Sequence, residues 1–262
     1  NTFIFPCFYK PNDKDYEKFG YLPKITITKI KKQNFYPIMR IEFSVPKILF
    51  GNNFYELEDA DFNGVLDNLK SKLEILGIWV EKETLKNAPV SAIHYSKNII
   101  LEKGLQVSSI INYLAKMDIP SSLDISKKDF RNNGTSLTLH TNSYEIAFYD
   151  KIKDIKQAKI SEKRSIEKFN MCNIAFIEKD FFEKYSVLRV EVRLNKKSVI
   201  KNLLNKIDIA IPLTFNNLFS SAISQKTILH YWDQITKNIY LYFNKANYID
   251  ILIYLLKDKK LS

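Results

Sequence analysis

The chain has 262 residues, of which 45% are hydrophobic and 13% aromatic, with only 6 glycines. This composition is sufficient for a folded core and excludes a disordered or low-complexity protein. Forty Lys and Arg against 29 Asp and Glu give a formal net charge of +11, which favours a polyanionic partner because protein cations displace the counterions condensed on phosphates. The competing explanation is compositional, since an AT-rich genome enriches Lys, Asn and Ile without selection for DNA binding.

The cysteines and apolar runs exclude several other classes. Cys7 and Cys172 form no CxxC pattern, so we expect neither a zinc site nor a disulfide framework, and a reducing cytoplasm is the expected compartment. The longest apolar run, residues 249–256, contains Asp250 and falls short of the roughly 20 residues of a membrane span. The chain begins at Asn1 without a signal-peptide pattern, and we expect the true N-terminus to lie upstream.

The apolar pattern predicts an α+β protein with a mainly antiparallel central sheet, flanking helices and a helical C-terminal part. We expect the first 23 residues to have no regular secondary structure. Period-two alternation predicts strands at residues 24–30, 39–45, 90–101, 136–141, 143–150 and 186–194. Helices are expected at 59–76, 107–117, 151–168, 227–243 and 248–256, and a polar loop at 129–134. We divide the chain into an α+β domain at 1–205 and a helical segment packed on it at 206–262.

Three of the predicted strands carry charged or nucleophilic residues opposite their apolar face. These are Arg40 and Glu42 on the first, Glu145, Tyr149 and Asp150 on the second, and Arg189, Glu191 and Arg193 on the third. If the strands are neighbours, the carboxylates would suit Mg²⁺ or Mn²⁺ and the arginines would suit phosphate oxygens. The alternative is a set of cross-strand ion pairs on a solvated sheet face.

The remaining motifs narrow the chemistry. The three histidines, His94, His140 and His230, include no His-x-His pair, so a histidine metal site would need His94 and His140 to meet in space. There is no GxxxxGK[ST] loop for nucleotide hydrolysis and no GxSxG elbow for acyl transfer. The basic helix expected at 151–168 is the best local candidate for a DNA contact, its alternative being a solvated helix face.

A resemblance to a known group of proteins rests on three segments. Residues 137–151, LTLHTNSYEIAFYDK, resemble the "Ser, apolar strand, Tyr-Asp-Lys" segment of rolling-circle replication initiators of the Rep_trans plasmid and gene II/X filamentous phage families. Residues 189–194, RVEVRL, resemble their Arg-x-Glu-x-x-Leu-like strand, and residues 40–53 resemble their "strand, Pro-Lys, Gly-Asn-Asn" element. The segments span about residues 38–195 in the families' order. Ala147 departs from the pattern, because these families often carry a basic residue there.

The resemblance implies a metal-dependent, site-specific single-strand nick at a plasmid or phage origin, with a tyrosine joined to the 5′-phosphate. It implies Tyr149 as the nucleophile. Tyr95, which has polar neighbours and is expected near a loop, is the rival. The implied ligands of Mg²⁺ or Mn²⁺ are Glu42, Asp150 and Glu191. The implied phosphate contacts are Lys151 and Arg193, and the basic character of the chain adds further expected DNA contacts at Arg40, Lys97, Lys153, Lys156 and Arg189.

The expected partner is origin DNA in a single-stranded or cruciform region, without a membrane. The resemblance leaves open a second copy of the chain and a host helicase as further partners. Two other functions remain open on the sequence. One is a catalytically silent, sequence-specific DNA-binding protein, and the other is a basic structural protein whose charge is compositional.

Overall fold

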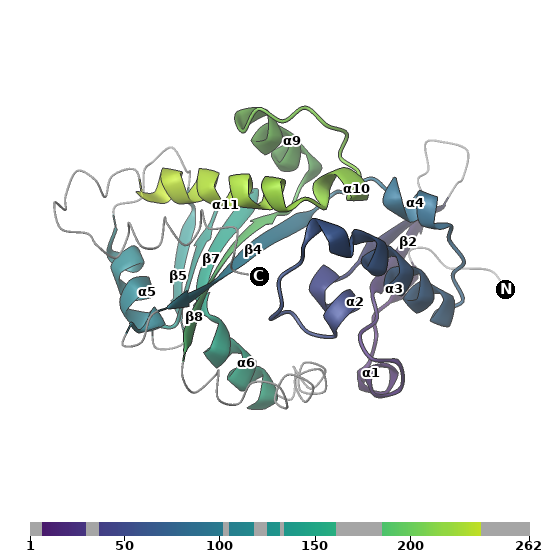
Figure 1. Ribbon diagram of the computed structural model, residues 1–262, viewed down its shortest axis with the longest axis horizontal. Helices are drawn as coiled ribbons and strands as arrows, with labels where there is room; N and C mark the ends of the chain where they lie inside the picture. The colour runs from purple at the N-terminus through teal and green to yellow at the C-terminus, as the bar shows by residue number, and fades with distance from the viewer. Residues whose placement is uncertain are drawn as a thin grey trace.

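The computed structural model describes residues 7–29, 37–101, 105–117, 125–131, 134–160 and 185–236. It confirms the α+β class, with antiparallel sheets and flanking helices (Figure 1). The strands are β1 (Cys7–Tyr9), β2 (Lys24–Lys29), β3 (Pro37–Glu42), β4 (Ile93–Leu101), β5 (Lys127–Arg131), β6 (Ser136–His140), β7 (Tyr144–Asp150) and β8 (Ser186–Leu194). The helices are α1 (Asp13–Phe19), α2 (Val45–Phe50), the 3-10 helix η1 (Asp59–Asp61), α3 (Phe62–Ile75), α4 (Lys82–Lys86), α5 (Val107–Lys116), α6 (Lys151–Ile160), α9 (Lys197–Lys206), α10 (Phe215–Leu218) and α11 (Ser221–Thr236).

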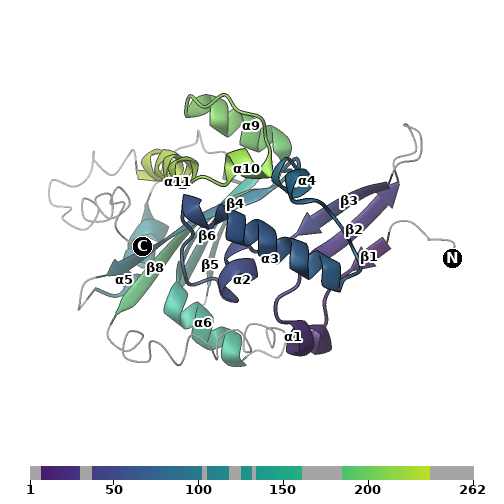
Figure 2. The same cartoon turned by 45° about the vertical axis from the view of Figure 1, so that its right-hand side comes forward.

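The described strands form two antiparallel sheets, one in the order β1-β2-β3 and the other in the order β4-β8-β7-β6-β5. The smaller sheet packs on α3 (Figure 2). Val65, Leu66, Leu69 and Leu73 recur at three- and four-residue steps on α3, and this apolar stripe is buried together with Ile25 of β2. The helix predicted from this spacing is therefore confirmed, and its apolar stripe is what joins it to the sheet.

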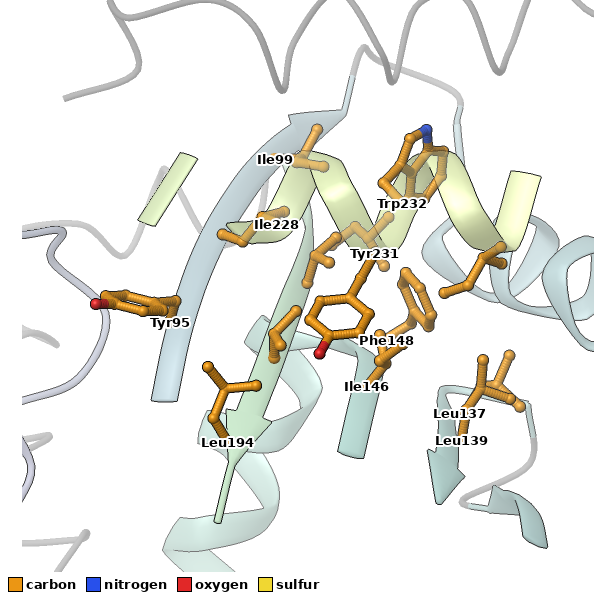
Figure 3. Packing of buried hydrophobic residues seen from close by; sticks show 14 of the residues in the cluster. Tyr95, Ile99, Leu137, Leu139, Ile146, Phe148, Leu194, Ile228, Tyr231 and Trp232 are labelled. Carbon is orange, nitrogen blue, oxygen red and sulfur yellow. The ribbon is translucent and has the colours of Figure 1, made fainter. Parts of the chain in front are cut away.

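The larger sheet has one apolar and one polar face, because successive residues of a strand point to opposite sides. Its apolar face packs on α5 and α11 (Figure 3). The ring centroids of Tyr144 and Tyr231 lie 4.8 Å apart, and those of Phe148 and Trp232 lie 6.1 Å apart in an edge-to-face contact. These contacts leave the polar face turned away from α11, toward the side where α6 lies (Figure 1).

The first 23 residues are not wholly irregular, because they contain β1 and α1. The start of α1 is stabilised by a reciprocal capping box, in which the side chains of Asn12 and Asp15 accept hydrogen bonds from each other's backbone N–H. This pattern of a polar cap and an acidic residue three positions later is a local signal that the sequence analysis missed.

Two further boundaries differ from the prediction. The strand predicted at 39–45 ends at Glu42, because Pro46 stands in the first turn of α2, where its fixed φ suits a helix. The polar loop predicted at 129–134 begins as part of β5, since Asp129 to Arg131 pair with β6. The expected helical residues 161–168, 237–243 and 248–256 lie outside the described residues.

The C-terminal segment shares its core with the larger sheet. Ile228, Trp232 and Ile235 of α11 belong to the same buried cluster as Val192 and Ile146 of the strands. No helix in the described part of the chain has the length and apolar character needed to cross a membrane.

Candidate functional site

Strands β7 and β8 place the polar residues of the second and third predicted strands side by side. Their antiparallel register sets Tyr149 opposite Arg189, Ala147 opposite Glu191 and Glu145 opposite Arg193. Because these positions are two residues apart along each strand, all six side chains lie on the polar face. The condition set in the sequence analysis is therefore met for these two strands.

A pocket of about 310 Å³ opens on this face. Its lining residues are Asn53, Thr135, Ser136, Thr138, Ala147, Tyr149, Asp150, Asp154, Glu191 and Arg193. Ala147 lies in the middle of the lining, between Thr138 on β6 and Glu191 on β8 in the register. Its single methyl group fills little of the space that a basic side chain would occupy. The presence of alanine, where the resembled families often carry a basic residue, therefore helps to create the pocket.

Tyr149, Glu191 and Arg193 form a connected polar network at the pocket. The Tyr149 hydroxyl donates to Oε2 of Glu191 at 2.8 Å, and Nε of Arg193 donates to Oε1 of the same carboxylate at 2.9 Å. Nη1 of Arg193 also donates to Oε2 of Glu145 at 3.0 Å. His94 approaches from β4, with its Nδ1 3.7 Å from Oε1 of Glu191. Glu191 is therefore held in one orientation between the phenol and the guanidinium.

The ionisation states of Glu191 and Tyr149 are set by their burial and by the charged side chains around them. Burial opposes ionisation of Glu191, but Arg193 and the Tyr149 hydroxyl overcome it and lower the pKa of Glu191 below its ordinary value. Burial raises the pKa of Tyr149, and the Glu191 and Asp154 carboxylates add to this rise, whereas the charge of Arg189 opposes it. The resting site therefore contains an ionised Glu191 and a neutral Tyr149 phenol.

Two buried cations lie behind the pocket and both hold Asn53. Nη1 of Arg189 donates to the Asn53 backbone carbonyl at 2.7 Å, and Nζ of Lys151 donates to the Asn53 side-chain Oδ1 at 2.9 Å. Arg189 is 4% exposed, Lys151 is fully buried, and Nε of Arg189 has no hydrogen-bond partner among the residues that the structure describes. Lys151 also lies 3.2 Å from Oδ2 of Asp154. These bonds fasten the loop after α2 against the end of the sheet.

The two predicted tyrosines occupy opposite faces of the larger sheet. Tyr149 lines the pocket, whereas Tyr95 lies within β4 and not at a loop, on the apolar face (Figure 3). Tyr95 donates a 2.8 Å hydrogen bond to the Leu218 carbonyl, and burial raises its pKa. Tyr95 shares its side of the strand with Ile93, Ile99 and Leu101, although Lys97 interrupts this stripe, and the pattern was the signal that could have placed Tyr95 in the core.

The three predicted metal ligands are not brought together. Asp150 and Glu191 line the pocket, but Glu42 lies on β3 of the smaller sheet, where it is exposed and pairs with Lys24. β3 pairs with β2 and not with β7 or β8, and this separates Glu42 from the other two. Asp154, one helical turn after Asp150, is a third carboxylate on the pocket that the sequence analysis missed. Within the described ranges, no three His, Cys, Asp or Glu side chains converge as they would around a metal.

The other predicted DNA contacts are scattered. Arg40 is exposed on β3, and Lys153 and Lys156 are exposed on α6. Lys97 pairs with Glu56 at 2.6 Å. Only Arg193 among the predicted cations lines the pocket, although Lys151 and Arg189 lie directly behind it.

The histidines do not form a pair. His94 is on β4 and His140 is on β6, and both β8 and β7 lie between these strands. His140 lies instead between two carboxylates, 3.3 Å from Oδ2 of Asp129 and 3.5 Å from Oε1 of Glu145.

Comparison with known proteins found no relative: no family model, no curated protein and no solved structure matches the chain.

Proposed function

We propose that this protein is a replication initiator of the rolling-circle type, which nicks and rejoins one strand of origin DNA through Tyr149. The observation that carries the proposal is the 2.8 Å hydrogen bond from the Tyr149 hydroxyl to the ionised Glu191 carboxylate, at the wall of a polar pocket. A phenol with an adjacent carboxylate combines a nucleophile with an acceptor for its proton. The excess of cations, +11 over the chain, supports a polyanionic substrate.

In the proposed reaction the Tyr149 oxygen attacks the phosphorus of a phosphodiester. The bond from this oxygen to phosphorus forms, the bond from phosphorus to the 3′-oxygen breaks, and the 5′-phosphate stays on the tyrosine. Glu191 accepts the phenol proton, and the departing 3′-oxygen takes up a proton to become a hydroxyl. The reverse attack by that hydroxyl rejoins the strand, because the phosphotyrosine ester conserves the energy of the broken bond.

The charge of the pocket supports a divalent cation as cofactor. Its lining has three carboxylates, Asp150, Asp154 and Glu191, against one guanidinium, Arg193, which leaves a net charge of −2. Carboxylate oxygens are the ligands that Mg²⁺ and Mn²⁺ prefer. Because no three such side chains converge within the described residues, we assign the ion to the pair Asp150 and Asp154 and leave Glu191 as the proton acceptor. When bound, the ion would neutralise phosphate charge and favour the phenolate.

Arg189 and Lys151 have a supporting part in the proposal. Arg189 stands directly across the strand pair from Tyr149, and it favours the phenolate that forms during attack. Neither cation is available as a freely moving phosphate contact, because each is buried and bonded to Asn53. We therefore assign them to positioning and electrostatics at Tyr149. We place the protein in the cytoplasm, where origin DNA lies.

A catalytically silent, sequence-specific DNA-binding protein is the second candidate. Two observations favour it. The Tyr149 phenol is neutral at rest, and Arg193 is already shared between Glu145 and Glu191 in the manner of an ordinary cross-strand ion pair. On this hypothesis, Tyr149 serves only to orient Glu191.

The experiment that separates the two candidates uses a pool of single-stranded oligonucleotides with a random central region. The protein is incubated with the pool and Mn²⁺, Mg²⁺ or EDTA, and DNA that remains attached in detergent is isolated and sequenced. Nicking predicts a metal-dependent covalent adduct that contains the 3′-labelled fragment and a common sequence at the attachment point. Binding to DNA without any adduct under these conditions would favour the silent protein.

A further inference from the structure

We propose that the single strand of DNA leaving the Tyr149 pocket crosses β6 and is held at the edge of the sheet by Lys127 and Arg131 of β5. The inference rests on the proposed function, since it extends the same site to the DNA next to the cleaved bond. It adds a binding surface on β5, of which residues 129–131 belong to the loop predicted from the sequence.

The strand register aligns this surface with the nucleophile. Tyr149 of β7 is paired with Ser136 of β6, and Ser136 is paired with Arg131 of β5. The three positions form one row across the polar face. With neighbouring strands about 4.8 Å apart, Arg131 begins about 10 Å from Tyr149, a distance that a short run of nucleotides covers.

The pocket is continuous with this route. Ser136 and Thr138 of β6 both belong to its lining, and their side chains are short. Hydroxyl groups of this kind donate hydrogen bonds to phosphate oxygens. The next strand outward is β5, which forms the edge of the described sheet, so the route from the pocket over β6 ends at exposed side chains.

The two cations at the edge are organised by one carboxylate. Nζ of Lys127 lies 2.9 Å from Oδ1 of Asp129, and Nη2 of Arg131 lies 2.8 Å from its Oδ2. The Lys127 and Arg131 side chains are 61% and 68% exposed, whereas Asp129 is 16% exposed. The hydrogen bond from Lys127 and the charge of Arg131 lower the pKa of Asp129. Two exposed cations share one carboxylate and leave a net positive charge at the edge.

The opposite exit from the pocket is less suited to DNA. It is bounded by Asp150 and Asp154, which stand at the start of α6 and which the proposed function assigns to the divalent cation. The exposed Lys153 and Lys156 of α6 lie beyond these carboxylates in the sequence. The proposed cation site therefore occupies the α6 side of the pocket, and the β5 side is left for the strand.

The test compares two double variants with equal loss of charge, Lys127→Gln with Arg131→Gln and Lys153→Gln with Lys156→Gln. All proteins also carry Tyr149→Phe, so that binding is measured without chemistry. Fluorescence anisotropy with labelled oligothymidine over a range of salt concentrations gives the affinity and its salt dependence. Two lost phosphate contacts reduce the log–log slope by about 1.4, at about 0.7 per contact on single strands, which is roughly a tenfold loss of affinity near 0.15 M salt.

We expect this loss in the β5 variant and little change in the α6 variant. An unchanged slope in the β5 variant, the full loss in the α6 variant instead, or no binding of oligothymidine by the parent would each overturn the inference. Absence of a covalent adduct with the unmodified Tyr149 protein, together with the expected slopes, would overturn the nicking function alone and leave the binding surface in place.

Discussion

The buried amino group of Lys151 and the side chain of Asn53 meet at 2.9 Å, although 98 residues separate them in the chain. This bond links the start of α6 to the loop after α2. It holds one wall of the pocket, since Asn53 and Asp154, which both bind the Lys151 amino group, belong to the lining.

Replacing Lys151 with Met tests this link. The change leaves the Asn53 side-chain Oδ1 and the partly buried Asp154 carboxylate without their shared cation, and we expect the free energy of unfolding to fall by about 1–3 kcal/mol. Urea denaturation gives the value. Lys153→Met, on the exposed side of the same helix turn, is the control and should change stability by no more than about 0.5 kcal/mol. A more stable Lys151→Met protein would mean that the cost of burying the amino group exceeds the value of its bonds.

The two tyrosines of the larger sheet should respond oppositely to the loss of a hydroxyl group. Tyr149→Phe removes the nucleophile and one hydrogen bond, so we expect complete loss of the covalent adduct and a change in stability of about 1 kcal/mol. Tyr95→Phe leaves the buried Leu218 carbonyl unpaired, and we expect a loss of about 1–3 kcal/mol with adduct formation retained. Adduct yield on a denaturing gel and urea denaturation measure the two effects. An adduct formed by Tyr149→Phe but not by Tyr95→Phe would contradict the assignment of the nucleophile.

Glu191 should make the stability of the protein depend on pH in acid. Its pKa in the folded protein lies below the ordinary value of 4.5. Its ionised form therefore contributes stability above about 4.5, and this contribution is lost as the pH falls through the lowered folded value. We expect the difference in unfolding free energy between the wild-type protein and Glu191→Gln to be greatest near pH 7 and to shrink toward about pH 3. A difference that stays constant over this range would show that folding does not lower the pKa of Glu191, and a difference that grows toward pH 3 would show that folding raises it.

The same substitution has a catalytic consequence. Glu191→Gln removes the proton acceptor and should abolish the adduct. Glu145→Gln is the matched control, because Glu145 bonds to the same Arg193 but does not line the pocket. We expect Glu145→Gln to retain most of the adduct yield, and equal loss in both variants would indicate that the position of Arg193 is the essential feature.

Binding of a divalent cation should raise the stability of the protein. A ligand that binds only the folded state at a hundred times its Kd adds about 2.7 kcal/mol, which thermal unfolding with Mn²⁺ against EDTA measures. Asp150→Asn and Asp154→Asn should each remove most of this gain. Asn still caps a helix, so Asp150→Asn keeps the bond from the Lys153 backbone N–H. Glu42→Gln is the control and should keep the full gain, and a loss confined to Glu42→Gln would exclude the pocket as the metal site.

The sequence determined the elements whose signals are local and repeated. The alternation of Val190, Val192 and Leu194 with arginines and Glu191 predicted β8 and its two unlike faces, and the spacing of Leu66, Leu69 and Leu73 predicted α3. Such patterns persist because burial of one face selects apolar residues at the period of the element. α1 and α2 were not predicted because seven and six residues are too few to show a helical period, and β5 was not predicted because four of its five residues are charged.

The tertiary structure decided which of these faces meet. β7 pairs with β8 and places Tyr149 beside Glu191, but β3 pairs with β2 and carries Glu42 into the other sheet. Alternation places a residue on a face but does not name the neighbouring strand, because strand pairing depends on contacts far apart in the chain. For the same reason the sequence did not place Asn53 and Asp154 at the site. Both residues lie outside the strands, and the fully buried Lys151 holds them at the pocket.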